Sequence, residues 1–168
     1  IDMSEKLNKL LMLVLASSCG VIVSTAFSCG CNSHRSDDAD KSDAAKNEDA
    51  DREAEACLKL GRAHFDEGRC DEAIAACRKA IAIKPDYAEA YNGMSAAYGR
   101  LGKHIDALVA LKKAVAIKPD YSKAYCNMGL TYHILGRHAE SLVAYNKAIA
   151  IKPDYADPYF GKGNVYKD

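Results

Sequence analysis

The sequence has no tryptophan, few aromatic residues and no excess of either charge. Its 168 residues contain 23 Lys and Arg against 23 Asp and Glu. Affinity for nucleic acid comes mostly from basic side chains that neutralise phosphates, so this balance argues against a nucleic-acid-binding protein. With 27% charged and 49% hydrophobic residues, the composition is that of an ordinary globular protein rather than a collagenous or wholly disordered chain.

The sequence also lacks the common motifs of catalysis and metal binding. It has no glycine-rich phosphate-binding loop and no histidine pair at the i,i+4 spacing of a helical metal site. The odd number of cysteines does not suggest a disulfide framework. Cys29, Cys31 and His34 lack a fourth ligand and a rigid frame for a metal. We therefore predict neither an enzyme nor a cofactor or metal site.

The first 31 residues have the pattern of an export or anchoring segment. Lys6 and Lys9 precede an apolar stretch, and residues 10–31 contain no charged residue. A basic start followed by such a stretch is typical of a signal peptide, and about 20 apolar residues also approach the length that spans a bilayer. We predict that residues 1–31 are a signal peptide, a lipoprotein signal or a membrane anchor. The rest of the chain is then extracytoplasmic, in the cell envelope or outside the cell.

Two cleavage chemistries fit this segment. Residues 24–26 offer the small side chains that signal peptidase I reads, whereas residues 26–29 loosely resemble a bacterial lipobox with Cys29 as the lipidation candidate. A lipobox usually has an aliphatic residue such as Leu three positions before its cysteine, and Ala26 stands there instead. A retained anchor with incidental cysteines is the third alternative.

Residues 32–53 are acidic and nearly free of large apolar side chains, with eight acids against four bases. Such a segment buries too little surface to offset the entropy lost on ordering. It is predicted to be an acidic flexible linker that holds a domain away from the membrane. The alternative is that residues 44–53 begin the first helix early.

From residue 54 the sequence repeats every 34 residues. The pentapeptide Ile-Lys-Pro-Asp-Tyr occurs three times, and residues 88–121 match residues 122–155 at 18 positions. Apolar residues recur at spacings of three and four in each unit, which indicates two amphipathic helices. Gly102 and Gly136 are predicted to form the turn between them, and the proline ends the second helix. Helix pairs this small must stack on their neighbours to cover their apolar faces.

The period and the small, glycine, aromatic and proline positions resemble the tetratricopeptide repeat (TPR) family. The resemblance covers residues 54–168, with repeats at 54–87, 88–121 and 122–155 and a partial repeat at 156–168. Ser95 and Ser141 depart from the usual Gly and Ala. The resemblance implies an all-α, right-handed superhelical solenoid of antiparallel helix pairs. It also implies a non-enzymatic scaffold for protein–protein interaction, without a cofactor.

In this family the usual binding surface is the concave face, lined by the first helix of each unit. The resemblance places eight partner-binding residues there: Arg62, Asn92, Arg100, Lys123, Asn127, Leu130, Ile134 and Phe160. Basic and apolar side chains together suit an extended peptide or a protein partner. The thiol of Cys126 is expected on the same face. The clamp that some members use for chaperone C-termini is not matched at Leu58, Gly93 or Asn127, so we do not predict chaperone-tail binding.

The partial fourth repeat raises a second class of function. A single helix leaves Tyr159 and Tyr166 without the second helix that would cover them, and solenoids usually end in a polar capping helix. An uncapped end can stack on the first repeat of another copy, and this contact does not close on itself. The alternative is therefore a structural subunit that self-assembles head-to-tail into an extracellular filament. A truncated reading frame would also explain the partial repeat.

Overall fold

The computed structural model describes residues 37–167, with side chains from residue 47 onward. These residues form seven helices and no strand. The helices are α2 (Asp37–Asp66), α3 (Cys70–Ile83), α4 (Ala88–Arg100), α5 (His104–Ile117), α6 (Ser122–Ile134), α7 (His138–Ile151) and α8 (Ala156–Val165). The predicted signal or anchor segment and the lipidation candidate Cys29 lie outside the described residues.

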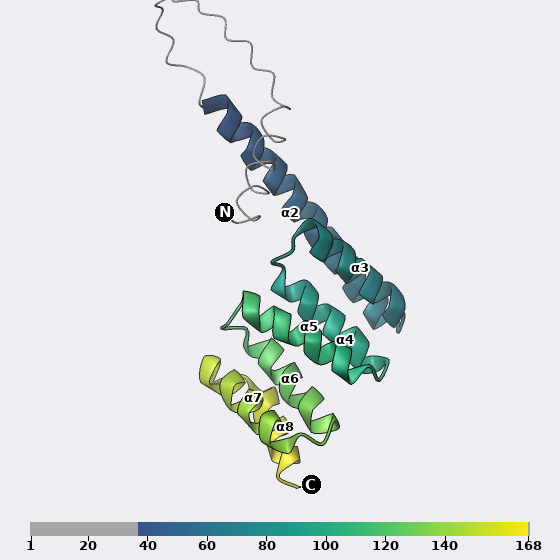
Figure 1. Ribbon diagram of the computed structural model, residues 1–168, viewed down its shortest axis with the longest axis vertical. Helices are drawn as coiled ribbons and strands as arrows, with labels where there is room; N and C mark the ends of the chain where they lie inside the picture. Colours follow the sequence, from purple (N-terminus) through teal and green to yellow (C-terminus); the bar gives the residue numbers. More distant parts are fainter. Residues whose placement is uncertain (1–36, 168) are drawn as a thin grey trace, which may run out of the picture. The chain divides into compact units, whose positions relative to one another are not determined.

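Consecutive helices pack as hairpins that follow one another along a single axis (Figure 1). The pairs are α2 with α3, α4 with α5 and α6 with α7, while α8 begins a fourth unit and packs on both α6 and α7. The first helix of each unit also contacts the first helix of the next. The predicted all-α solenoid of helix pairs, with one helix in its last unit, is confirmed.

A glycine with positive φ links the two helices of each complete unit. The φ angles are 80° at Gly68, 72° at Gly102 and 70° at Gly136. After α4, the Gly102 N–H donates to the Gly99 carbonyl at 3.1 Å and the Lys103 N–H donates to the Tyr98 carbonyl at 2.9 Å. This is the Schellman pattern. The residue in the left-handed conformation turns the chain so that N–H groups beyond the helix donate to carbonyls of its last turn.

The lysine and proline of each pentapeptide end the second helices. The Lys84 N–H still donates to the Ala80 carbonyl at 2.9 Å, and Lys118 repeats this contact one unit later. Pro85 then lacks an N–H and disfavours helical geometry in the residue before it, so the chain leaves the helix there. The connection to the next unit is therefore short and equivalent at each repeat.

Each second helix packs one side chain between the first helices of its own unit and the next. Cys77, Leu111 and Tyr145 occupy this equivalent position, and all three are buried. Tyr145 requires glycine on both sides: a Cβ added to Gly129 would lie 2.7 Å from its ring, and one added to Gly161 would lie closer still. The two first helices can therefore approach the ring only because neither residue has a side chain.

Hydroxyl groups replace small apolar residues at the two departures from the repeat. The Ser95 hydroxyl donates to the Asn92 carbonyl in its own helix at 2.7 Å. The Ser141 hydroxyl donates to the Gly129 carbonyl across the α6–α7 pair, also at 2.7 Å. Both side chains are buried with their hydrogen bonds satisfied, so neither departure leaves an orphaned polar group.

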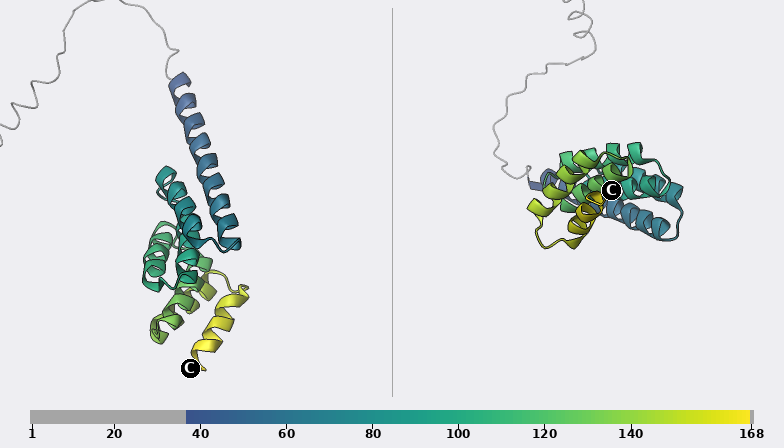
Figure 2. Two further views of the ribbon diagram at one scale, coloured as in Figure 1. Left: turned by 90° about the vertical axis from the view of Figure 1, so that its right-hand side faces the viewer. Right: turned by 90° about the horizontal axis from the view of Figure 1, so that it is seen from below.

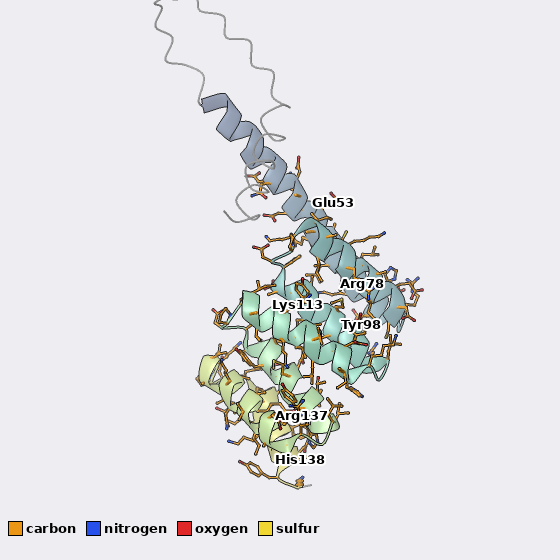
Figure 3. The ribbon with its side chains drawn as sticks, in the orientation of Figure 1. Glu53, Arg78, Tyr98, Lys113, Arg137 and His138 are labelled. Carbon is orange, nitrogen blue, oxygen red and sulfur yellow. The ribbon has the colours of Figure 1, made fainter. Side chains whose placement is uncertain are left out.

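A hydrogen bond and buried rings join successive units. Arg78 of α3 donates to the Tyr98 hydroxyl of α4 at 2.9 Å (Figure 3). One unit later, Tyr125 and Tyr132 of α6 are buried in the main apolar cluster, which also contains Leu108 and Leu111 of α5. The unit boundaries are therefore continuous core rather than solvated seams.

The expected linker is wrong for residues 37–53, because α2 begins at Asp37 and runs unbroken into the first unit. Figure 2 shows α2 projecting beyond the other helices. Arg52 pairs with Glu48 and Asp49 one turn earlier, at 3.8 and 3.3 Å, and Asp51 accepts a hydrogen bond from Lys84 at 2.8 Å. Pairs of this spacing stabilise a solvated helix without burial, a contribution that the composition argument omitted. Although α2 is 30 residues long, no helix among the described residues is both long and apolar enough to cross a membrane.

The glycine turns give a test with opposite expected signs. Gly136→Ala should lower the free energy of unfolding by about 1–2 kcal/mol, because a Cβ is strained at positive φ. Gly99→Ala should raise it by up to about 1 kcal/mol, because this position is inside α4 and a Cβ there meets nothing within 4 Å. Urea denaturation followed by circular dichroism measures both. Equal shifts of the same sign would contradict the turn geometry.

Candidate functional site

The first helices share one face, which contains two hollows. The N-terminal hollow measures about 440 Å³ and is lined by Gly61, Arg62, Phe65, Asp66, Cys77, Glu89, Asn92, Gly93, Ala96, Tyr121, Lys123 and Asn127. The C-terminal hollow measures about 420 Å³ and is lined by Cys126, Asn127, Leu130, His133, Tyr145, Tyr155, Ala156, Asp157, Phe160, Gly161 and Asn164. Asn127 lines both hollows. We call this continuous surface the groove.

The groove follows a single stripe along each first helix. In α6 its members are Lys123, Cys126, Asn127, Leu130 and His133. Spacings of three and four residues keep these side chains on one side of a helix. The 34-residue period then places the residues of α4 and α8 in line with them. The repeat that builds the core therefore also aligns the groove across units.

Among the described residues, the N-terminal hollow has more cations than carboxylates that are free of an ion pair. Arg62 and Lys123 are exposed at its edge, and neither forms an ion pair with another described residue. The carboxylate of Glu89 is engaged by Lys118 at 3.1 Å, which leaves Asp66 as the acid of the hollow that has no ion pair with another described residue. Two cations against one free carboxylate favour an acidic group of a ligand.

A pair of amides forms the centre of the groove. Asn127 donates from Nδ2 to Oδ1 of Asn92 at 2.8 Å, and the backbone carbonyl of Asn127 accepts a hydrogen bond from the Thr131 hydroxyl at 2.7 Å. Asn92 was expected to be a contact residue, but it is only 8% exposed. It supports Asn127, which retains an amide oxygen and a second N–H for other partners.

The C-terminal hollow is mainly aromatic and apolar. Leu130 is half-exposed and Phe160 is 75% exposed. Tyr145 and Tyr155 also line this hollow, and burial raises the pKa of Tyr145 to about 12, so its hydroxyl stays neutral. Cys126, whose thiol was expected on the surface, lines the hollow but is buried, and this burial raises its pKa.

Two predicted contact residues lie outside both hollows. Arg100 and Ile134 are exposed, but they are the last residues of α4 and α6. The Arg100 guanidinium lies over the Phe65 ring, 4.0 Å from its centroid, and donates to the Phe65 carbonyl at 2.6 Å. Arg100 therefore joins α4 to α2. The structure brings the other six predicted residues into the groove.

The sequence prediction missed groove residues of two kinds. Glu89 is in register with Lys123 and Asp157, so the 34-residue period could have identified it. Cys77 and Tyr145 belong to second helices and reach the groove between first helices. No sequence pattern indicates this, because it depends on how closely the first helices approach each other.

Among the residues described, no group of three His, Cys, Asp or Glu side chains could hold a metal ion. Burial raises the pKa of the Cys77 thiol to about 11, which keeps it protonated at neutral pH. A protonated thiol is neither a good nucleophile nor a good metal ligand. The groove therefore offers shape, hydrogen bonds and charge to a ligand.

Comparison with known proteins supports the repeat architecture. A family model described as TPR repeat matches residues 61–102, 100–136 and 131–168. No curated protein matches the sequence. The crystal structure of MamA is 33% identical, with a TM-score of 0.63 over 68% of this chain and 67% of that chain. The first TPR of Spaghetti (RPAP3), bound to the HSP90 peptide SRMEEVD, is 24% identical, with a TM-score of 0.66 over 69% of this chain and 92% of that one. The Sgt2 TPR domain from Aspergillus fumigatus is 23% identical, with a TM-score of 0.66 over 68% and 78%.

Proposed function

Because this chain belongs to the tetratricopeptide repeat family, we propose that it is a non-enzymatic scaffold whose groove binds an extended peptide segment of a partner protein. The observation that carries the proposal is the continuity of the two hollows through Asn127. A ligand that follows the groove crosses successive first helices. An extended segment fits such a path, because its side chains can enter one hollow after another.

The chemistry of the groove suits a peptide backbone with both polar and apolar side chains. Asn127 can bond to a peptide N–H or C=O, and Arg62 and Lys123 can bind a carboxylate. Phe160 and Leu130 offer apolar surface in the next hollow. Exposed aromatic residues beside polar ones are typical of binding sites, where the ring is desolvated by its partner.

The chaperone peptide bound by the Spaghetti (RPAP3) domain is not proposed as the ligand here. At 24% identity that structure shares the fold with this chain. Leu58 stands at one clamp position and is buried, and Gly93 and Asn127 replace the polar and basic residues at two others. The groove therefore calls for a peptide of different sequence.

We also propose that the scaffold acts outside the cytoplasm of a bacterial cell. The support is the uncharged apolar stretch of residues 10–31 behind Lys6 and Lys9, together with the small residues around Ala26 and Cys29. Either a lipid on Cys29 or a retained apolar segment would hold the repeats at a membrane. The helical segment 37–53 would then separate them from its surface.

Self-association is a second candidate function, supported by the open face of α8. Tyr159 and Tyr166 occupy the positions of Tyr125 and Tyr132 one unit earlier. The earlier pair is 7% exposed at each residue, whereas Tyr159 is 50% and Tyr166 is 69% exposed. A helix pair of another copy could cover these rings as α7 covers the earlier ones, which would give a head-to-tail assembly.

Substitutions in the groove test the binding proposal. Peptides selected from a random library on the purified chain should bind roughly 5- to 30-fold more weakly to Lys123→Ala and to Phe160→Ala, as fluorescence polarisation would measure. Lys112→Ala is the matched control, because Lys112 is exposed on α5 and lines neither hollow. If all variants bind the peptides with equal affinity, the binding site lies outside the groove.

Fractionation of bacterial cells tests the location. The full chain should be recovered with membranes or in the periplasm, and deletion of residues 1–31 should leave it in the cytosol. Incorporation of a labelled fatty acid should be lost in Cys29→Ser and kept in the matched variant Cys31→Ser if Cys29 is lipidated. A full chain that remains cytosolic would contradict export.

Light scattering tests self-association. The mass of the purified chain should rise with concentration in the micromolar range, and Tyr159→Ser with Tyr166→Ser should reduce it to the monomer because the apolar contact is removed. Phe160→Ala, on the groove side of the same helix, should leave the mass unchanged. A wild-type chain that stays monomeric throughout this range would exclude the head-to-tail contact.

A further inference from the structure

The N-terminal hollow lies at the junction where the side chain packed between two units is the smallest of the three equivalent ones. Cys77, Leu111 and Tyr145 are equivalent residues of α3, α5 and α7. At the junction between the third and fourth units, the Tyr145 ring fills the space between Gly129 and Gly161. At the junction between the first and second units, the equivalent side chain is one CH2 and a sulfur.

The first helices beside Cys77 do not compensate with larger side chains. Its neighbours are Gly61 and Gly93, where an added Cβ would lie 3.1 and 3.4 Å from the Cys77 sulfur. At the next junction, the residues equivalent to these glycines are Ser95 and Asn127. The first junction is therefore the only one of the three in which a small residue faces two glycines, and the hollow opens there.

The lining of this hollow combines apolar residues with exposed charged ones. Gly93, Ala96 and Phe65 give it apolar surface beside the amide of the buried Asn92, and a Cβ on Gly93 would meet nothing closer than 3.4 Å. Arg62 and Lys123, which have no ion-pair partner among the described residues, stand at the rim. The hollow thus offers a side chain from outside apolar surface with two cations beside it.

We propose that the N-terminal hollow takes a bulky apolar side chain of the bound peptide, seated over Cys77 between Gly61 and Gly93, with a carboxylate next to it held by Arg62 and Lys123. The proposal rests on the proposed peptide-binding function and specifies the ligand. The inserted side chain does at the first junction what Tyr145 does at the third. The ligand then gives the first and second units a contact that Tyr145 of the chain itself gives to the third and fourth units.

The surface directly around Cys77 favours an apolar side chain at this position. A polar or charged group placed over Cys77 would lose water and find a protonated thiol, a glycine backbone already in its helix and the methyl group of Ala96. The volume of about 440 Å³ lies within the range of small-ligand pockets and exceeds what a methyl group would fill. Arg62 and Lys123 outnumber the free carboxylate of Asp66 in this hollow, which adds a preference for an acid close by.

The test uses residues that the repeat already tolerates. Gly93→Asn places in the hollow the residue found at the equivalent position, Asn127, so the variant is expected to fold. Gly99→Asn is the matched control on the same helix, because a Cβ at Gly99 meets nothing within 4 Å and Gly99 does not line the hollow. Twelve-residue peptides are selected from a random library on the full chain and resynthesised with single alanine substitutions and with free or amidated C-termini.

The expected result is a consensus with one aromatic or large aliphatic residue beside Asp or Glu. Gly93→Asn should weaken binding by roughly tenfold to a hundredfold, and Gly99→Asn should not. Replacing the apolar peptide residue by alanine should weaken binding to the wild-type chain by about the same factor. It should weaken binding to Gly93→Asn only slightly, because the two changes remove the same contact. Loss of binding on amidation would identify the carboxylate as the peptide terminus, and retained binding would identify it as a side chain.

Two outcomes would overturn the proposal. If Lys123→Ala and Phe160→Ala weaken the selected peptides but Gly93→Asn does not, the groove binds peptides and the hollow does not seat a side chain. If no selected peptide is sensitive to any groove substitution, peptide binding in the groove fails as well. Cys77→Leu, which copies Leu111, gives a second and independent way to fill the hollow and should repeat the result of Gly93→Asn.

Discussion

The structure depends on one contact that recurs at each junction: a side chain of a second helix packed between the first helices of two successive units. Cys77, Leu111 and Tyr145 make this contact, and all three are buried. A helix pair cannot cover its own apolar faces, so the units hold together only through such contacts. The turn glycines and the prolines matter because they return the chain to the same register every 34 residues.

The same contact shapes the face on which a partner can bind. At the last junction this side chain is the large Tyr145. Gly129 of α6 and Gly161 of α8 lie against its ring, and the ring lines the C-terminal hollow. Where Cys77 is small, the N-terminal hollow opens above it. Core packing and groove shape are therefore set by the same position of the repeat, so a substitution there changes both stability and the binding surface.

The sequence predicted much of the fold because the repeat is a local pattern. Each turn glycine and each proline restricts its own backbone, and these restrictions do not depend on distant residues. The same reasoning failed for residues 37–53, because low apolar content argues against burial but not against a solvated helix. Ion pairs one turn apart, such as Arg52 with Glu48, support that helix.

For the groove, the sequence by itself determined which helix face lines it: spacings of three and four place Lys123, Asn127 and Leu130 on one side of α6, and the 34-residue period places Phe160 in line with them. Tertiary structure decided how these residues are used. It buried Asn92 beneath Asn127, turned Arg100 onto Phe65 and brought Cys77 and Tyr145 to the groove from the second helices. The physical reason is distance: periodicity sets the direction of a side chain around its helix axis, whereas its exposure depends on how closely the neighbouring helices approach.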